Sequence, residues 1–463
     1  MTETTFFTID EEKCVNCHQC IAVCSAKYAN NGVNETIEVD NNLCIGCGEC
    51  IKACTHNARI PVDDFEIAMK ALENAEKVIA IVAPAVASNF PNQYLKLNGW
   101  LKSLGIEAIF DVSFGAELTV KSYVEHIKRN KPKMVIAQPC PAIVRYVQIY
   151  KPELIPHLAP ADSPMVHSMK MVKEFYPKYN KHKMLIVSPC VAKKVEFEET
   201  GVGDYNVTIT KIQNYLLDHK IDLNIFPETE FDNDPAERAV LFSTPGGLLE
   251  TAEREVPNIR YQSRKIEGPH TIYKYLNHLP EQLKKGMSPL LIDCLNCELG
   301  CNGGTGTNSY DKSPDELEYY IHQRRILAQE EHNTSDNDST SISKYEKLID
   351  KYWKEELYDR KYKNLSENTK KLSIPSEKQL KEIYLLMDKQ EDADIRNCSS
   401  CGYDSCEIMA TAIFNNLNKT ENCHHYLHEE LKSKTEEITK QKQEIITDTE
   451  VVLGLIQKIR EMV

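Results

Sequence analysis

The chain has 463 residues, 17 of them cysteine, and its 55 basic and 69 acidic side chains give a formal net charge of −14. This acidity argues against a nucleic-acid partner, because phosphate binding needs a basic face. No apolar run approaches the roughly 20 residues of a membrane span, and the N-terminal sequence MTETTFFTIDEEKC lacks the basic and apolar regions of a signal peptide. We therefore expect a cytoplasmic protein, without a membrane partner, that uses reduced thiols for metal or redox chemistry.

Residues 1–70 contain two cysteine runs of the same spacing, C-x2-C-x2-C-x3-C. This is the pattern of bacterial two-cluster ferredoxins, in which the fourth cysteine of each run ligates the other cluster. One 4Fe–4S cluster would then use Cys14, Cys17, Cys20 and Cys54, and the other would use Cys44, Cys47, Cys50 and Cys24. The proline that usually follows the fourth cysteine is replaced by Ser25 and Thr55. A pair of zinc knuckles is the alternative for these eight cysteines.

From about residue 77 to residue 311 the chain alternates between predicted strands and helices. Strands are expected at 77–83 and 107–112 and around Met134, Met184, Ala239 and Leu290, and helices at 93–104 and 116–129. Such alternation predicts a largely parallel sheet that is covered by helices.

Three apolar runs of this region, at 131–140, 181–190 and 287–297, each end in a cysteine. Ligands of α/β sheets bind outside the carboxyl ends of the strands. We therefore expect four thiols to converge on one buried cavity, those of Cys140, Cys190, Cys297 and Cys301. Four thiols at the dry centre of an intracellular protein indicate a metal cluster rather than a disulfide.

The three cysteine loops resemble those of the FeFe hydrogenases. They read QPCP at 138–141, SPCVAKKVE at 188–196 and DCLNCELGCNGGTG at 293–306. Four further segments resemble the same family: APAV at 83–86, DVSFGAELT at 111–119, KPELIPHLAPADSP at 151–164 and GGLLETAER at 246–254. With the ferredoxin module, the resemblance covers about two-thirds of the chain.

The resemblance implies an H-cluster, a 4Fe–4S cubane joined through one thiolate to a diiron site with CO, cyanide and a dithiolate bridge. Cys301 matches the bridging thiolate, and Lys193 matches the lysine that donates a hydrogen bond to a cyanide. A surface lysine on a helix is the alternative for Lys193. Glu196 is retained from the family's proton-transfer residues. The resemblance also implies that the cofactor lies against Ala83, Pro84, Pro139, Ser188, Lys193 and Leu295.

The departures from the family pattern fall on the residues that move protons. Pro139 stands where productive members have a proton-relaying cysteine, and it has no ionisable group. Ala159 replaces a relay serine, and Tyr123 and His126 replace two carboxylates, with Glu125 next to His126. Since a proton relay contributes about 10²–10⁴-fold to rate, turnover should be slow. The combination resembles the sensory branch of the family.

We therefore expect a slow FeFe hydrogenase that interconverts H2 and protons and senses H2 or redox state. A bulk ferredoxin-linked hydrogenase and a non-enzymatic, hydrogenase-like iron–sulfur protein are the alternatives. Cys294 has no assigned cluster, and a buried structural thiol competes there with a redox or proton-transfer role.

The C-terminal part contains a third cysteine motif, C-x2-C-x4-C-x16-C, formed by Cys398, Cys401, Cys406 and Cys423. It resembles a small one-cluster 4Fe–4S domain of electron-transfer complexes and sensory hydrogenases, with tetrahedral zinc as the alternative. Beyond it, apolar residues recur every seven positions at Leu431, Ile438, Ile445, Val452 and Ile459. This partial heptad predicts either a helix packed on its own chain or a homodimeric coiled coil. A ferredoxin-like or signalling protein is the expected partner.

The expected fold class is an α/β H-cluster domain with an N-terminal α+β ferredoxin domain, a small C-terminal 4Fe–4S domain and a terminal helix. The expected boundaries are 1–70 for the ferredoxin, 71–375 for the H-cluster domain, 376–425 for the 4Fe–4S domain and 426–463 for the helix.

Overall fold

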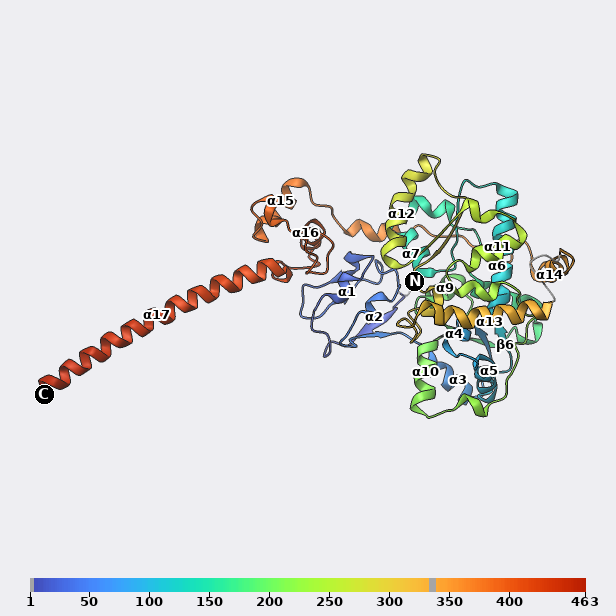
Figure 1. Ribbon diagram of the computed structural model, residues 1–463, viewed down its shortest axis with the longest axis horizontal. Coiled ribbons are helices and arrows are strands. Elements are labelled where there is room, and N and C mark those ends of the chain that lie inside the picture. The colour runs from blue at the N-terminus through green and yellow to red at the C-terminus, as the bar shows by residue number, and fades with distance from the viewer. Residues whose placement is uncertain (1–3, 333–338) are drawn as a thin grey trace. The chain divides into compact units, whose positions relative to one another are not determined.

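The computed structural model describes residues 4–332 and 339–463 (Figure 1). Its contacts divide the chain into two compact units. Unit 1 comprises residues 1–13 and 40–370, and unit 2 comprises residues 14–39 and 371–463. The two cysteine runs of the predicted ferredoxin thus fall in different units. The expected domain boundaries stay predictions.

Unit 1 is built on a four-stranded, entirely parallel sheet in the order β6-β5-β8-β9. The strands are β5 (Val78–Val82), β6 (Ile109–Asp111), β8 (Lys183–Ser188) and β9 (Tyr205–Thr208). Side chains of β5 alternate between two cores, with Ile79 and Ile81 in one and Val78, Ala80 and Val82 in the other. A strand that is buried on both faces needs an apolar residue at every position, which is why the sequence VIAIV forms the centre of the sheet.

Helices cover both faces of this sheet. Residues of α6 (Val112–Asn130) and α8 (Pro164–Phe175) belong to one core. Residues of α3 (Phe65–Glu73), α5 (Tyr94–Ser103) and α10 (Ile209–Asp218) belong to the other. The α/β class that the sequence predicts is confirmed for this unit.

The remaining parallel strands form a second sheet in the order β10-β11-β7, where one sheet was expected. These are β7 (Val135–Ile136), β10 (Ser263–Glu267) and β11 (Leu291–Leu295). No sequence pattern predicts β10, because its five residues are partly or fully exposed and form no apolar run. The strand expected at Ala239 is also wrong. Residues Ala239–Ser243 form a 3-10 helix, because a buried carboxylate, Glu117, accepts hydrogen bonds from the backbone N–H groups of residues 237–239.

The antiparallel pair β1 (Phe7–Ile9) and β4 (Arg59–Pro61) also lies in unit 1. The other helices of this unit are α2 (Glu49–Lys52), α4 (Val86–Asn89), α7 (Pro141–Tyr150), α9 (Lys193–Thr200), α11 (Gly247–Glu255), α12 (Pro269–Lys284), α13 (Pro314–His332) and α14 (Ser339–Tyr352).

Unit 2 contains a short antiparallel pair, β2 (Asn30–Asn31) and β3 (Glu38–Val39), and four helices. These are α1 (Gln19–Ala22), α15 (Glu377–Leu386), α16 (Cys406–Phe414) and α17 (His424–Met462). Figure 1 shows α17 as one long, uninterrupted helix. Among the described residues, no helix combines the length and the apolar composition that crossing a bilayer requires.

Candidate active site

The predicted cysteines of unit 1 follow the ends of three strands and lie around one cavity. Cys140 follows β7 and immediately precedes α7, which begins with Pro141, a residue suited to the first helical position. Cys190 follows β8, and Cys297 follows β11. Together with Cys301 they line a single cavity of about 740 Å³ that is free of protein atoms and partly open to solvent. The expected convergence is therefore present, although the strands belong to two sheets rather than one.

Burial keeps the four cavity thiols protonated unless a metal displaces their protons. Burial raises the pKa of Cys190 to about 12 and that of Cys297 to about 11, and neighbouring thiolates raise the pKa of Cys190 further. Burial likewise raises the pKa values of Cys140 and Cys301. No three described His, Cys, Asp or Glu side chains lie close enough together to chelate one metal ion. Four thiols arranged around a cavity instead fit a multi-iron cluster, whose irons replace the protons.

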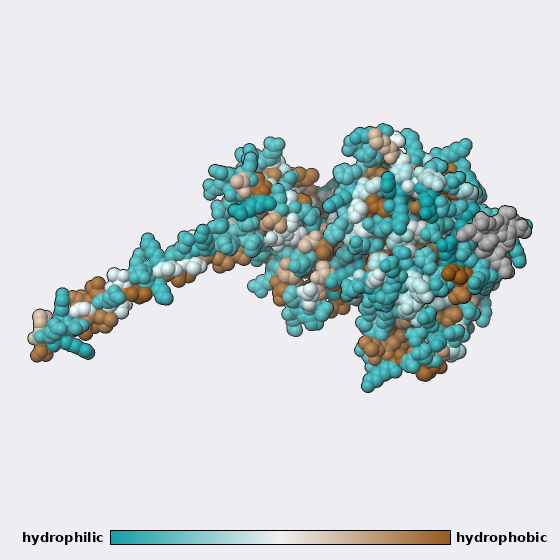
Figure 2. Space-filling view, viewed as in Figure 1, coloured by the Kyte–Doolittle hydropathy of each residue, from teal (hydrophilic) through white to brown (hydrophobic). Residues whose placement is uncertain are grey.

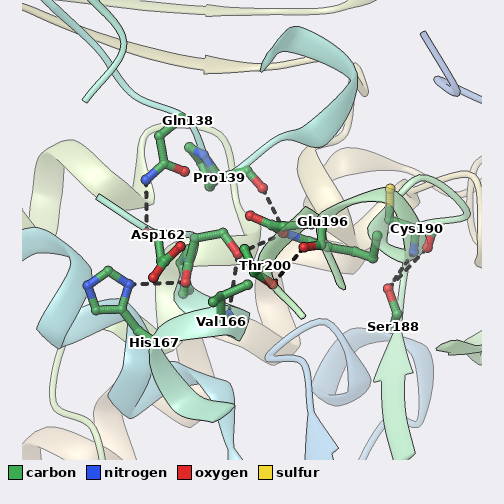
Figure 3. Close-up of polar contacts among 12 residues, drawn as sticks. Gln138, Pro139, Asp162, Val166, His167, Ser188, Cys190, Glu196 and Thr200 are labelled. Carbon is green, nitrogen blue, oxygen red and sulfur yellow. Dashed lines mark hydrogen bonds and ion pairs between the residues drawn. The ribbon is translucent and has the colours of Figure 1, made fainter. Parts of the chain in front are cut away.

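Most of the other expected cofactor-contacting residues lie in the cavity wall. Ala83, Pro84, Pro139, Lys193 and Leu295 all line it. Ser188 has a different position, since its Oγ lies 3.1 Å from both the N and the O of Cys190 and so holds the Cys190 loop (Figure 3).

Lys193 is buried, which rules out the surface-lysine alternative. Its Nζ donates to Glu196 Oε2 at 2.7 Å, Pro139 O at 3.0 Å and Ser163 Oγ at 3.2 Å. Glu196 in turn accepts from Arg360 Nη1 at 2.5 Å. Burial alone would raise the pKa of Glu196, but the two cations beside it lower that pKa overall. Glu196 is therefore held as a carboxylate between an ammonium and a guanidinium.

The part of the chain that forms this cavity is similar to known protein families. Residues 76–305 match the family described as "Iron only hydrogenase large subunit, C-terminal domain", and residues 6–55 match "4Fe-4S dicluster domain". The periplasmic [Fe] hydrogenase large subunit of Nitratidesulfovibrio vulgaris is 32% identical over 284 residues, which cover 54% of this chain and 67% of that protein. The chain belongs to the iron-only, or FeFe, hydrogenase family.

Other relatives are more distant. Iron hydrogenase 1 of Clostridium pasteurianum is 25% identical over 423 residues, 75% of this chain and 72% of the relative. The nuclear prelamin A recognition factor of Mus musculus is 23% identical over 264 residues, 46% of this chain and 57% of the relative. A solved FeFe hydrogenase, described for oxygen inactivation at its H cluster, has a TM-score of 0.51 at 18% identity and covers 65% of this chain and 99% of its own. That structural likeness supports the fold.

Pro139, Ala159, Tyr123 and His126 are the residues expected at the family's proton-relay positions. Pro139 has no titratable atom, and Ala159 is fully buried. The buried hydroxyl of Tyr123 accepts from Gln138 N at 3.3 Å, and burial raises the pKa of Tyr123 well above its usual range. His126 contacts Asn130 Nδ2 at 2.9 Å through its Nδ1. Its neighbour Glu125 pairs with Lys121, Lys128 and Arg129.

Cys294 lies inside β11 with 1% of its surface exposed. Its Sγ donates to Ala137 O at 3.5 Å, and burial raises the pKa of the thiol well above its ordinary value. These contacts match the structural reading of this cysteine.

The structure adds residues that the sequence did not single out. Arg360 follows α14 in a segment without a recognisable motif, so no sequence signal identified it as the partner of Glu196. Ser163, the N-cap of α8, was detectable in principle because serine before a proline is a helix-start signal. The backbone before Ser163 is further fixed by Gln138, whose Nε2 donates to Asp162 O at 2.9 Å (Figure 3 labels both residues).

The second cysteine run, at residues 44–54, packs on the third cysteine loop within unit 1. Lys52 Nζ donates to Gly303 O at 3.2 Å. Gly48 has a φ of 80°, and a Cβ there would lie 2.6 Å from Thr305 Cβ. Within the run, Cys44 Sγ accepts from Gly46 N at 3.4 Å and Cys54 Sγ accepts from Ala58 N at 3.3 Å, contacts that favour thiolate ligands.

In unit 2, Cys398, Cys401, Cys406 and Cys423 line a second, smaller cavity together with Met387 and Met409. Gly402, between two of these cysteines, has a φ of 85°, a left-handed conformation that glycine adopts without strain. This arrangement fits a 4Fe–4S cluster.

The ion cluster of Lys193, Glu196 and Arg360 yields a stability prediction. Replacing Arg360 with Gln should lower the free energy of unfolding by about 1–3 kcal/mol at pH 7, because a buried carboxylate loses a charged partner. The lowered pKa of Glu196 stabilises the native state above the pKa of the unfolded chain, and this stabilisation disappears as pH falls through the folded pKa. The difference between the two proteins should therefore shrink on acidification.

Denaturant unfolding at several pH values between 7 and 4 would measure this difference. Lys285, which pairs with Glu281 on the surface at 2.5 Å, provides the control, and Lys285→Gln should change the free energy by no more than about 0.5 kcal/mol. A difference that grows as the pH falls would contradict the assignment of Glu196 as the carboxylate.

Proposed function

We propose that this protein is a slow FeFe hydrogenase that reports H2 or redox state rather than producing or consuming hydrogen in bulk. The observation that carries the proposal is a mismatch within one cavity. The four cysteines and Lys193 line it together, whereas the wall position of the family's proton donor holds Pro139. Four cysteines that can hold the cluster, beside a proline in place of the relay cysteine, favour binding and slow turnover over fast catalysis.

Four 4Fe–4S groups would be held by four sets of cysteines, two in the ferredoxin runs, one in the cavity and one in the C-terminal motif. When bound at the cavity, the H-cluster supplies the chemistry that interconverts H2 with protons and electrons. The chain's residues then have separate tasks. Ala83, Pro84 and Leu295 exclude water, Lys193 holds a proton at Nζ beside the cavity, and Glu196 fixes that ammonium at 2.7 Å.

The alternatives differ in what they require. A bulk hydrogenase needs a fast proton route, and the buried Tyr123 and Ala159 count against one. Two observations favour a non-enzymatic iron–sulfur protein. One is the likeness to nuclear prelamin A recognition factor. The other is that three protein atoms accept hydrogen bonds from Lys193 Nζ, which uses all three of its N–H groups. The apolar room beyond the thiols, lined by Val112, Met165 and Phe242, favours a larger group than a cubane alone.

The partner side of the proposal rests on α17. From Leu431 to Val463 every residue is exposed, including the heptad residues Leu431, Ile438, Ile445, Val452 and Ile459. Figure 2 shows hydrophobic residues along this helix. An isolated helix with an apolar stripe is marginal in water, and pairing with a second copy buries the stripe. We place the protein in the cytoplasm, with a ferredoxin-like or signalling protein as its further partner.

Metal content tests the cluster assignments. Anaerobic reconstitution should yield about 16 Fe per chain, since four cubanes hold four irons each. With the diiron unit inserted, CO and cyanide bands should appear in the infrared spectrum. A content of about 8 Fe with bound zinc would remove the cavity and C-terminal clusters, and absence of the infrared bands after supply of the maturation machinery would favour the non-enzymatic alternative.

Restoring the family's relay residues tests the explanation for slow turnover. The quadruple change Pro139→Cys, Ala159→Ser, Tyr123→Glu and His126→Glu should raise hydrogen production in a dye assay by up to about 10²-fold and exceed every single change. The carbonyl that Lys193 contacts is kept in Pro139→Cys. Glu125→Gln, at an ion-paired neighbour outside the relay positions, is the control. Native turnover equal to that of productive family members would show that another proton route exists.

Deletion of residues 431–463 tests pairing through α17. The intact chain should be a dimer and the truncated chain a monomer by light scattering, with unchanged iron content, because the deleted residues start beyond the last cysteine. Ile438→Glu should weaken the dimer, whereas Thr439→Glu, one position off the heptad, should leave it intact. An intact chain that is monomeric at micromolar concentration would rule out the coiled coil.

A further inference from the structure

The two ferredoxin-type cysteine runs differ at two backbone positions of the same kind. In the second run, Gly46 and Gly48 have φ values of 71° and 80°. The equivalent residues of the first run are Asn16 and His18, with φ values of 50° and 63°. Asn and His are among the side chains that tolerate this left-handed conformation best, and unlike glycine they bring polar atoms to the turn.

Asn16 and His18 use their side chains differently. Asn16 Nδ2 donates to Gly32 O and Asn34 O at 3.2 and 2.8 Å, which closes a turn within the first run's own segment. His18 is 6% exposed, and its Nδ1 lies 2.9 Å from Cys401 O. A carbonyl only accepts, so Nδ1 carries the proton of this bond. His18 thus joins the first run directly to a cysteine of the C-terminal motif.

The C-terminal motif is shaped to receive this contact. A Cβ on Gly402 would lie 2.9 Å from His18 O and 3.2 Å from Ala22 N, so only glycine allows the approach. Lys27 Nζ then joins both sides, donating to Gly402 O at 3.1 Å and to Ala22 O at 2.7 Å.

A second set of bonds holds the other end of the motif. Gly32 N donates to Leu417 O at 2.8 Å, and Asn422 Nδ2 donates to Gly32 O at 2.9 Å. Asn422 directly precedes Cys423, the last cysteine of the motif. The first run and the segment that follows it are therefore bonded to the C-terminal motif at two places, near Cys401 and near Cys423. All of these residues belong to unit 2.

We propose that the C-terminal motif is the electron partner of the first cysteine run, and that His18 is the positioning residue of that contact. One electron passes from the reduced iron–sulfur site to the oxidised one, with no bond made or broken. The inference rests on the proposed function only in that both motifs hold 4Fe–4S clusters. Hydrogen turnover is not required, so the two fail separately.

The test uses His18→Gly in the full-length, reconstituted protein without the diiron unit. Glycine is what the second run has at this position, so the backbone is relieved rather than strained. In the native protein, electron paramagnetic resonance of the reduced state should show spin–spin interaction between the C-terminal and first-run sites. In His18→Gly the iron content should stay unchanged. The C-terminal signal, identified by its loss in Cys423→Ala, should appear several-fold more slowly after rapid mixing with a reductant.

Gly402→Ala should also slow electron transfer between the two motifs, because the new Cβ would push His18 and Ala22 of the first run away from the C-terminal motif. His278→Ala, at an exposed position on α12, is the control and should match the native protein. If His18→Gly lost iron, Lys27→Gln would provide the same comparison without touching His18. A native protein without spin–spin interaction, or variants that transfer electrons as fast as the native protein, would overturn the proposal.

Discussion

Burial of four thiols in one apolar cavity is the constraint on which the rest of unit 1 depends. Each strand that ends at this cavity must stop at a defined residue, and burial keeps each thiol protonated until a metal displaces the proton. The ion cluster behind the wall follows from the same constraint. A buried ammonium at Lys193 needs a counter-charge, Glu196 supplies it, and Arg360 balances the carboxylate in turn.

The buried ion cluster beside the cavity holds fixed charges and is not arranged to transfer protons. Lys193, Glu196 and Arg360 carry balanced charge only together with Glu199, which accepts from Arg360 Nη2 at 2.6 Å. Such a network resists the change in protonation that a relay requires. Pro139 adds a rigid backbone and a carbonyl that Lys193 uses, but no proton donor. The physical picture is of charged groups that keep a fixed electrostatic environment beside the cavity, which is the property that the proposed sensing role requires.

Much of this was predictable from sequence because cysteine spacing and apolar runs are local signals. The strands before Cys140 and Cys190, the α/β class and the shared cavity were all predicted and are present. Three features were not predictable. Strand β10 is too exposed to read as a strand, the 3-10 turn at Ala239 depends on a carboxylate more than a hundred residues away, and Arg360 reaches Glu196 only through the tertiary fold. Contacts between residues far apart in the sequence produce no local hydrophobic periodicity from which they could be predicted.

The close fit of Gly48 against Thr305, with Lys52 bonded to Gly303, limits how freely this module can be exchanged in evolution or design. Most two-cluster ferredoxins of equal cysteine spacing would carry the right ligands, yet any side chain at the position of Gly48 would collide with the third cysteine loop. Whether a ferredoxin fits against the H-cluster domain thus depends on the residues at the positions of Gly48 and Lys52 rather than on the cysteines. A search for natural ferredoxins that can be grafted onto this chain should therefore filter on those two positions first.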